Sequence, residues 1–223
     1  MPESLTFRSG SRTLDAFLTL PDGEGPFPGV LVIHEIFGLN DNVREVAERF
    51  AGQGYAALAV DLFGGQNRAL CMLRFMSGLL LDPLHNGSVH DLHAALGVLA
   101  ARSEVDSARL GAVGYCMGGS FAVALACTDG RLKAIAPYYA VNPRPLEAVA
   151  RSCPVVGSYP EQDFTAGMGR KLEAELEKQG VPHDIKVYEG AKHSFANDHG
   201  PNYDAAASED AWARTLRFFG KHV

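Results

Sequence analysis

Cys116 has the clearest chemical potential in this chain, because it lies within the segment Gly114-Tyr115-Cys116-Met117-Gly118-Gly119. A short apolar run at residues 109–113 precedes this segment, and an apolar helical pattern at residues 120–127 follows it. Glycines permit a sharp turn between a strand and a helix, since they add almost no bulk beside the central residue. A cysteine in such a turn is a candidate nucleophile, whose thiolate attacks the carbonyl carbon of an acyl group.

A cysteine nucleophile needs a histidine to accept its proton and an acid to orient that histidine. In a strand–turn–helix unit of this kind, the three residues follow the order nucleophile, acid, histidine along the chain. Asp163 follows an apolar strand pattern that ends at Tyr159, and Glu161 in the same stretch is a rival for the acid. Among the eight histidines, His193 fits best, because it lies in a loop after the last predicted strand. We therefore predict a triad of Cys116, Asp163 and His193.

Acyl transfer also needs hydrogen-bond donors for the oxyanion that develops on the carbonyl oxygen. The amide of Met117 directly follows the nucleophile at the start of a predicted helix, whose dipole favours negative charge. The segment His34-Glu35-Ile36-Phe37-Gly38 follows a β-branched run at residues 30–33. Its place in the chain makes the amide of Ile36 the second candidate donor.

Short apolar runs alternate with helical patterns, which predicts an α/β fold with a mostly parallel central sheet and helices on both faces. The predicted strands cover residues 14–20, 30–33, 55–60, 109–113, 132–137, 153–159 and 183–188, and the predicted helices cover residues 40–50, 88–101, 120–127, 164–179 and 203–219. Asp163 is also a candidate N-cap of the helix that follows it, a role compatible with catalysis. The pattern weakens at residues 63–87, a candidate cap or substrate loop. We predict one domain, residues 1–223.

The composition argues against several classes of function. Apolar residues make up 47% of the chain and the net charge is −6, so we expect no binding to nucleic acid. No window approaches the roughly 18 apolar residues of a membrane span, and no signal peptide is visible, so we expect a cytoplasmic protein. The four cysteines lack the spacing of a metal site or a disulfide framework. We expect free thiols, no bound metal, and a monomer or small homo-oligomer.

Together, Gly-Tyr-Cys-Met-Gly-Gly, His-Glu-Ile-Phe-Gly, the aspartate after a strand and His-Ser-Phe resemble the dienelactone hydrolase family over roughly residues 12–220. The resemblance implies an α/β-hydrolase fold and a Cys-His-Asp triad. It also implies a cofactor-free reaction, in which an enol-lactone is opened through a covalent acyl-enzyme that water then cleaves. In that family a glutamate at the position of Glu35 contacts the resting thiol and helps to generate the thiolate when substrate binds, which implies a functional role for Glu35.

The sequence departs from the family at Asn197, where the resemblance implies an arginine that binds the substrate carboxylate. Asparagine cannot replace the bidentate, charged contact of a guanidinium. Arg68 or Arg74 in the predicted cap region is a candidate for the family's second arginine. A neutral or less acidic ester or lactone is therefore the expected substrate. Aromatic residues that are candidates for an apolar pocket, and equally for plain core, are Phe37, Tyr115, Tyr138, Phe164 and Phe195.

Two alternative functions remain open at this point. One is a non-hydrolytic protein that keeps the fold and binds a small molecule or a partner. The other is a thiol redox sensor built on Cys116, which would need a resolving cysteine close to it. An intact triad favours the hydrolase.

Overall fold

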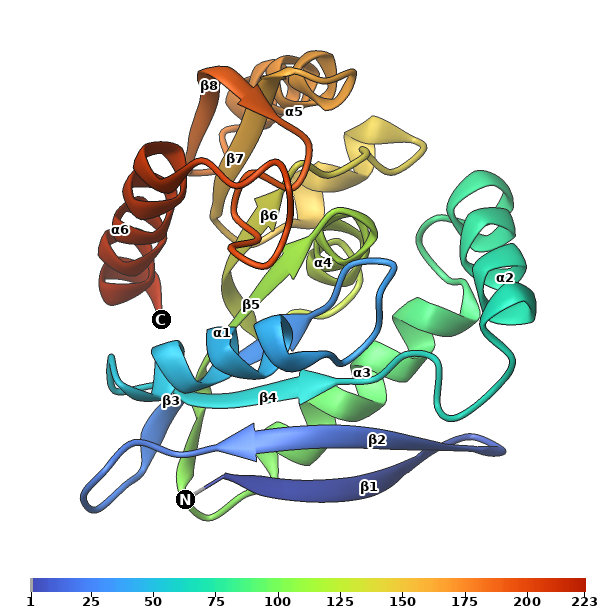
Figure 1. Cartoon of the computed structure of the whole chain (residues 1–223), viewed down its shortest axis with the longest axis vertical. Helices are drawn as coiled ribbons and strands as arrows, with labels where there is room; N and C mark the ends of the chain where they lie inside the picture. The colour runs from blue at the N-terminus through green and yellow to red at the C-terminus, as the bar shows by residue number, and fades with distance from the viewer. Residues whose placement is uncertain (1) are drawn as a thin grey trace.

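The computed structural model describes residues 2–223 and consists of an eight-stranded sheet with helices on both sides (Figure 1). The strand order is β1-β2-β4-β3-β5-β6-β7-β8, and β2 runs antiparallel to both of its neighbours. Every pair from β4 to β8 in this order is parallel, as predicted. The strands are β1 (Glu3–Ser9), β2 (Arg12–Thr19), β3 (Phe27–Ile33), β4 (Ala56–Val60), β5 (Val105–Tyr115), β6 (Leu132–Tyr138), β7 (Val155–Gln162) and β8 (His183–Lys192).

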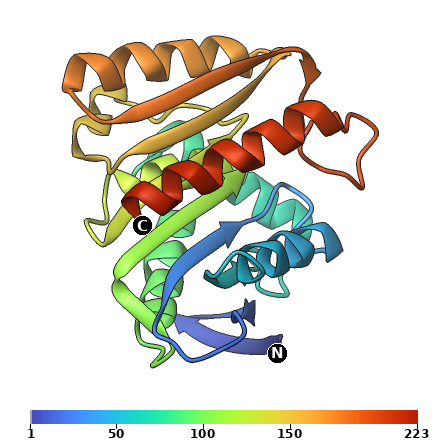
Figure 2. The same cartoon turned by 90° about the vertical axis from the view of Figure 1, so that its left-hand side faces the viewer.

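The helices divide between the two faces of the sheet. One face is covered by α1 (Asp41–Ala51) and α6 (Ala205–His222), which lie towards the viewer in Figure 2. The opposite face is covered by α3 (Gly87–Ala100), α4 (Met117–Ala126), α5 (Thr165–Gln179) and the 3-10 helix η1 (Leu146–Arg151). The helix α2 (Arg68–Leu81) lies beyond this layer, beside the ends of the strands (Figure 1).

Strand β3 shows why the central strands have continuous apolar sequences. Its residues Leu31 and Ile33 pack into the core beneath α3 and α4, while Val30 and Val32 pack into the core beneath α1 and α6. Because successive side chains of a strand point to opposite faces, a strand between two helical layers must be apolar at every position. Strand β3 pairs with β5 in the sheet, and both strands end at the candidate site.

The candidate cap or substrate loop at residues 63–87 contains a helix that was not predicted, because most of it forms α2. This helix buries only Cys71 and Phe75 fully, and it leaves apolar side chains such as Leu73 and Leu81 exposed. Apolar residues on all sides of a helix remove the periodic signal by which an amphipathic helix is recognised. Strand β1 was also missed, since it is an edge strand with mostly exposed residues.

Helix α2 is anchored to the rest of the molecule along one side. The ring of Phe75 is fully buried, with its centroid 5.3 Å from that of Phe63 and 6.0 Å from that of Phe121. Arg74 donates a hydrogen bond over 3.1 Å to Asp91 of α3, whose side chain is buried. These contacts fix which side chains of α2 face the candidate site. Among residues 2–223, no helix combines the length and hydropathy needed to cross a membrane.

Candidate active site

The three residues of the predicted triad lie at the carboxyl ends of three parallel strands. Cys116 follows β5, Asp163 follows β7 and His193 follows β8. Ligands of open α/β sheets bind at these ends, because the loops that follow the strands converge there. Cys116 and His193 line the same cavity, and His193 contacts Asp163. The tertiary structure thus brings together residues that are far apart in the sequence.

Cys116 occupies a strained turn between β5 and α4. Its φ is 54° and its ψ is −116°, a combination that is costly for a residue with a side chain. The flanking glycines make this turn possible: a Cβ on Gly118 would lie 2.4 Å from the carbonyl oxygen of Ile33. A Cβ on Gly114 would lie 2.2 Å from the carbonyl oxygen of Gly118. The glycines of the motif therefore let the turn press against β3 and present the sulfur to the cavity.

Asp163, rather than its rival Glu161, orients the histidine. Its carboxylate accepts a short hydrogen bond from Nδ1 of His193 and a second one, of 2.7 Å, from the hydroxyl of Thr165. Burial opposes ionisation of Asp163, but the hydrogen bonds from His193 and Thr165 outweigh it and hold its pKa below the usual value. Glu161 instead accepts a hydrogen bond from the amide of Gly190 over 3.0 Å. Glu161 therefore contacts the end of β8, just before His193.

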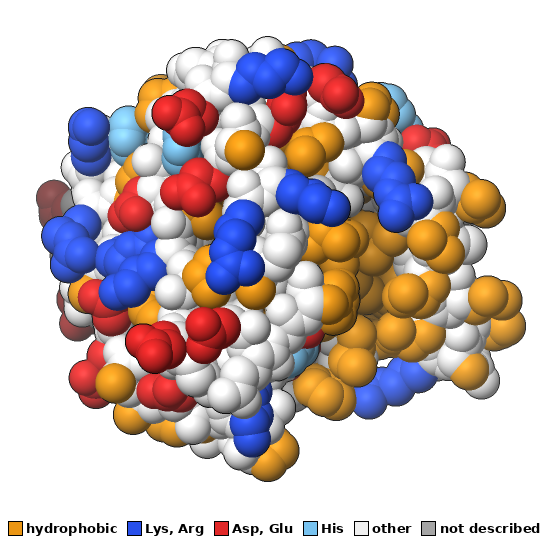
Figure 3. All heavy atoms as spheres, turned by 90° about the horizontal axis from the view of Figure 1, so that it is seen from above, with side chains coloured by type: hydrophobic (Ala, Val, Ile, Leu, Met, Phe, Trp, Pro, Cys, Tyr) orange, Lys and Arg blue, Asp and Glu red, His pale blue; other side chains and the backbone are white. Residues whose placement is uncertain are grey.

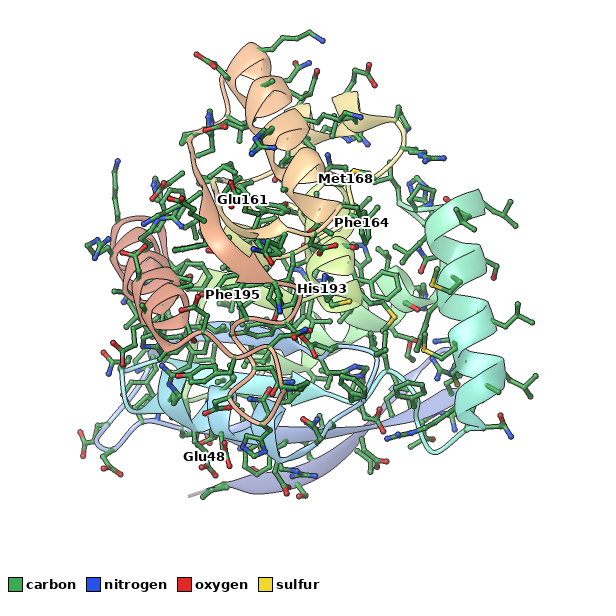
Figure 4. The ribbon with its side chains drawn as sticks, turned by 45° about the horizontal axis from the view of Figure 1, so that its top comes forward. Glu48, Glu161, Phe164, Met168, His193 and Phe195 are labelled. Carbon is green, nitrogen blue, oxygen red and sulfur yellow. The ribbon has the colours of Figure 1, made fainter. Side chains whose placement is uncertain are left out.

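His193 is held by its backbone as well as by Asp163. Its carbonyl accepts a hydrogen bond of 3.0 Å from the side chain of Asn202, and the next residue, Ser194, has a φ of 63°. The ring centroid of Tyr139 lies 4.9 Å from that of His193. In Figure 4, His193 lies below Phe164 on the side that faces α2, whereas Phe195 lies towards α6. With Nδ1–H donated to Asp163, Nε2 is the nitrogen left to accept a proton.

The two candidate oxyanion donors also lie at the cavity. Met117 and Ile36 both line it, and the amide of Met117 donates towards the sulfur of Cys116, which favours the thiolate. The loop that carries Ile36 is fixed by His34, which is completely buried. Nε2 of His34 accepts a hydrogen bond from the amide of Leu62 over 3.0 Å, while Nδ1 contacts the carbonyl of Glu35. Burial lowers the pKa of His34, so the ring is neutral and can make both bonds.

The thiol of Cys116 is protonated at rest. Burial and the nearby carboxylate of Glu35 raise its pKa to about 11, although the amide of Met117 acts in the opposite direction. Glu35 is itself buried, and its Oε1 has no hydrogen-bond partner among the described residues. A buried carboxylate beside a buried thiol disfavours a second negative charge on the sulfur. The resting site therefore holds a neutral thiol.

The cavity beside the sulfur has a volume of about 160 Å³. It contains the predicted residues Cys116, Met117, Ile36 and His193, and also Phe164, a predicted candidate for an apolar pocket. Sequence reasoning missed the other walls, which come from the unpredicted α2, from the segment after β6 and from the starts of α4 and α5. The walls that it missed are Met76, Leu79, Ser120, Tyr139, Val141 and Thr165. A signal existed for Tyr139, which follows a predicted parallel strand and so had to lie near this edge of the sheet.

Five predicted substrate-binding residues do not line this cavity. Arg68 donates to the carbonyl of Phe37 over 2.9 Å, and Phe37 itself points outward with 51% of its surface exposed. Arg74 is paired with Asp91. Tyr115 is buried beneath the site, with its ring 4.8 Å from that of Tyr138. The fifth residue, Asn197, donates to Oε2 of Glu35 over 3.4 Å. For Arg68, Arg74, Tyr115 and Asn197, a contact made within the protein takes the side chain that was expected to face the substrate.

Comparison with known proteins agrees with this architecture. The model of the dienelactone hydrolase family matches residues 14–223. The chain belongs to the dienelactone hydrolase family. The resemblance seen in the sequence is thereby confirmed, and with it the α/β-hydrolase fold and the broad class of hydrolases.

Relatives of this family resemble the chain over nearly its whole length. A protein of Saccharolobus solfataricus that is provisionally named a carboxymethylenebutenolidase is 31% identical, and the alignment covers 98% of each chain. A structure described provisionally as a dienelactone hydrolase from Klebsiella pneumoniae superposes with a TM-score of 0.87 at 25% identity, covering 100% of this chain and 99% of that one. A dienelactone hydrolase-like promiscuous phosphotriesterase from metagenomic libraries has a TM-score of 0.88 at 26% identity, covering 100% and 98%.

Proposed function

We propose that this protein is a cofactor-free hydrolase that opens lactones or cleaves activated carboxylic esters through an acyl-enzyme on Cys116. The observation that carries the proposal is the arrangement around one cavity. Cys116 and His193 both line it, His193 is oriented by Asp163, and Met117 and Ile36, whose amides are the candidate oxyanion donors, also line it. Nucleophile, base, orienting acid and oxyanion donors are the parts that acyl transfer requires.

The reaction begins from the neutral thiol. Nε2 of His193 takes the proton as the sulfur of Cys116 attacks the carbonyl carbon, and the amides of Met117 and Ile36 hold the oxyanion. The carbon–oxygen bond to the leaving group then breaks, and His193 returns the proton to the departing oxygen. Water next attacks the thioester with His193 as base, which frees the acid and restores the thiol. Thiolate is a good leaving group, so amides are poor substrates, and enol-lactones, aryl esters and thioesters are preferred.

Glu35 has a supporting role in this proposal. Its carboxylate lies near the sulfur and raises the pKa of Cys116, after the larger effect of burial. It keeps the empty enzyme in the thiol form, which protects the sulfur from oxidation because the thiolate is the form that reacts. The sulfur of Cys116 then becomes an active nucleophile only when a bound substrate takes up the negative charge on its carbonyl oxygen.

The test compares hydrolysis of a dienelactone and of a short-chain p-nitrophenyl ester by the wild type and by Cys116→Ala. Cys153→Ala is the matched control, because Cys153 is also a partly exposed free cysteine but does not line the cavity. We expect Cys116→Ala to lose turnover, Cys153→Ala to keep it, and quenched wild-type enzyme to gain the mass of the acyl group. Full activity in Cys116→Ala would refute the mechanism. A disulfide formed by peroxide alone would favour the redox sensor instead.

A further inference from the structure

Most side chains in the walls of the cavity beside Cys116 are apolar. Ile36 comes from the loop after β3, Met76 and Leu79 come from α2, and Phe164 comes from the start of α5. Figure 3 shows the hollow between the main body and the protruding part that contains α2, with hydrophobic side chains covering its visible walls. The described residues that line the cavity include no lysine, arginine, aspartate or glutamate.

The two aliphatic hydroxyl groups in the cavity, those of Ser120 and Thr165, are already engaged. The hydroxyl of Ser120 donates to the carbonyl of Cys116 over 3.3 Å and accepts from the amide of Val141 over 2.8 Å. The hydroxyl of Thr165 donates to Asp163. Neither is free to donate to a carboxylate on the substrate. Tyr139 also lines the cavity, and its buried hydroxyl has no hydrogen-bond partner among the described residues. The donors that remain are therefore this uncharged hydroxyl and the amides assigned to the oxyanion, and none of them is a cation.

The nearest arginines of the cap region are held away from the cavity. Arg74 pairs with Asp91, which is only 2% exposed, so moving Arg74 inward would strip a buried carboxylate of one of its two guanidinium partners. Arg68 caps the carbonyl of Phe37 and lies over the ring of Phe63, 5.3 Å from its centroid. An anionic substrate group entering the cavity would therefore lose its hydration without gaining a cation.

On these grounds, and resting on the proposed function, we propose that the substrate is an uncharged ester or lactone whose apolar group fills this cavity. The volume of about 160 Å³ limits the size of that group. Apolar protein cavities of about 150 Å³ take up benzene, so one six-membered ring or a chain of about five carbons fits. Met76 and Leu79 of α2, together with Phe164, then select the substrate by contact with this group.

The decisive experiment uses two p-nitrophenyl esters with the same leaving group, the pentanoate and the hemisuccinate. Their acyl chains are similar in length, but the hemisuccinate ends in a carboxylate. Burying an unpaired carboxylate costs several kcal/mol, so kcat/KM for the pentanoate should exceed that for the hemisuccinate by about 100-fold or more. The wild type supplies this ratio after subtraction of the uncatalysed rate, so the result does not depend on any variant folding.

A cation placed in the cavity should shift the ratio. Leu79→Arg is expected to raise the relative kcat/KM for the hemisuccinate by about tenfold or more, through a charge-assisted contact. Leu80→Arg is the matched control, because Leu80 lies on the same helix, is 62% exposed and does not line the cavity; it should leave the ratio unchanged. Circular dichroism checks that both variants fold.

The possible outcomes separate this inference from the proposed function. Equal rates, or faster turnover of the hemisuccinate by the wild type, would overturn the inference but leave the Cys116 mechanism standing. That result would direct attention to Arg144 and Lys171, which line a neighbouring hollow that shares Val141 with the cavity. Absence of Cys116-dependent turnover of either ester would overturn both proposals.

Discussion

Nδ2 of Asn197 donates a hydrogen bond over 3.4 Å to Oε2 of Glu35, and both side chains are buried. Asn197 was expected to contact the substrate, yet its amide faces the carboxylate that lies beside the nucleophile. The contact links the loop after β8 to the loop after β3, which carry His193 and Ile36 respectively. One hydrogen bond thus ties together the two loops that carry the proposed base and one proposed oxyanion donor.

Replacing Asn197 with leucine should therefore destabilise the protein. The variant leaves the buried carboxylate of Glu35 without its amide partner, which costs about 1–3 kcal/mol in the free energy of unfolding. Urea denaturation measures the loss. Asn42→Ala is the control, because Asn42 makes a similar side-chain hydrogen bond to Asp198 at the exposed surface, and its loss should cost about 0.5 kcal/mol or less. Equal losses in the free energy of unfolding for the two variants would mean that the hydrogen bond to Glu35 stabilises the protein no more than the exposed one does.

The raised pKa of Cys116 predicts how its alkylation depends on pH. With a pKa of about 11, the thiolate fraction is small near neutral pH and grows as the pH rises. Alkylation of the empty enzyme by iodoacetamide should therefore accelerate about tenfold per pH unit, without a plateau below about pH 9.5. The mass of the modified peptide identifies the site. A plateau below about pH 8 would show that the resting form is already thiolate.

Glu35→Gln should make Cys116 more reactive. Removing the negative charge favours the thiolate, so the pKa of Cys116 falls and alkylation at neutral pH becomes faster, although burial still keeps the pKa above its usual value. The comparison is Glu48→Gln, an exposed substitution on α1 away from the site (Figure 4). This control should react at the wild-type rate. Slower alkylation in Glu35→Gln would contradict the electrostatic role.

Asp163→Asn should lower kcat without unfolding the protein. The NH2 group of asparagine can donate to Nδ1 of His193, which a carboxylate cannot do, so the ring can take the tautomer that carries its proton on Nε2 and cannot accept one there. Losses of about 10⁴-fold accompany this change in other triads. Steady-state hydrolysis of the p-nitrophenyl ester measures the effect. Glu161→Gln is the matched control and should keep nearly full kcat, since Glu161 contacts the amide of Gly190 instead. A larger loss in Glu161→Gln would reassign the acid.

Gly118→Ala should destabilise the fold itself. The new Cβ would lie 2.4 Å from the carbonyl oxygen of Ile33 and 2.5 Å from that of His34, and backbone atoms cannot move away as a flexible side chain can. Overpacking of this kind costs about 1–3 kcal/mol or more. Gly167→Ala in α5 is the contrasting variant, because a Cβ there meets nothing within 4 Å. It should raise the thermal midpoint, since alanine favours a helix over glycine.

The amino-acid sequence by itself determined the features that depend on neighbouring residues. The apolar run at β3 revealed a strand buried on both faces, and the glycines around Cys116 revealed the turn that presents the nucleophile. The expected order of nucleophile, acid and histidine along the chain then pointed to Asp163 and His193. These signals are local, because a strand, a helix or a tight turn is encoded by residues a few positions apart.

Only the tertiary structure decided what the site offers to a substrate. It set Asp163 apart from Glu161, turned Arg74 towards Asp91, directed Asn197 to Glu35, and placed Met76 and Leu79 of α2 in the wall of the cavity. Each of these outcomes depends on a contact between segments distant in the chain, and a side chain with several possible partners takes the one that packing brings within reach. The candidate nucleophile was therefore visible in the sequence, whereas the apolar character of its cavity emerged only when the chain was folded.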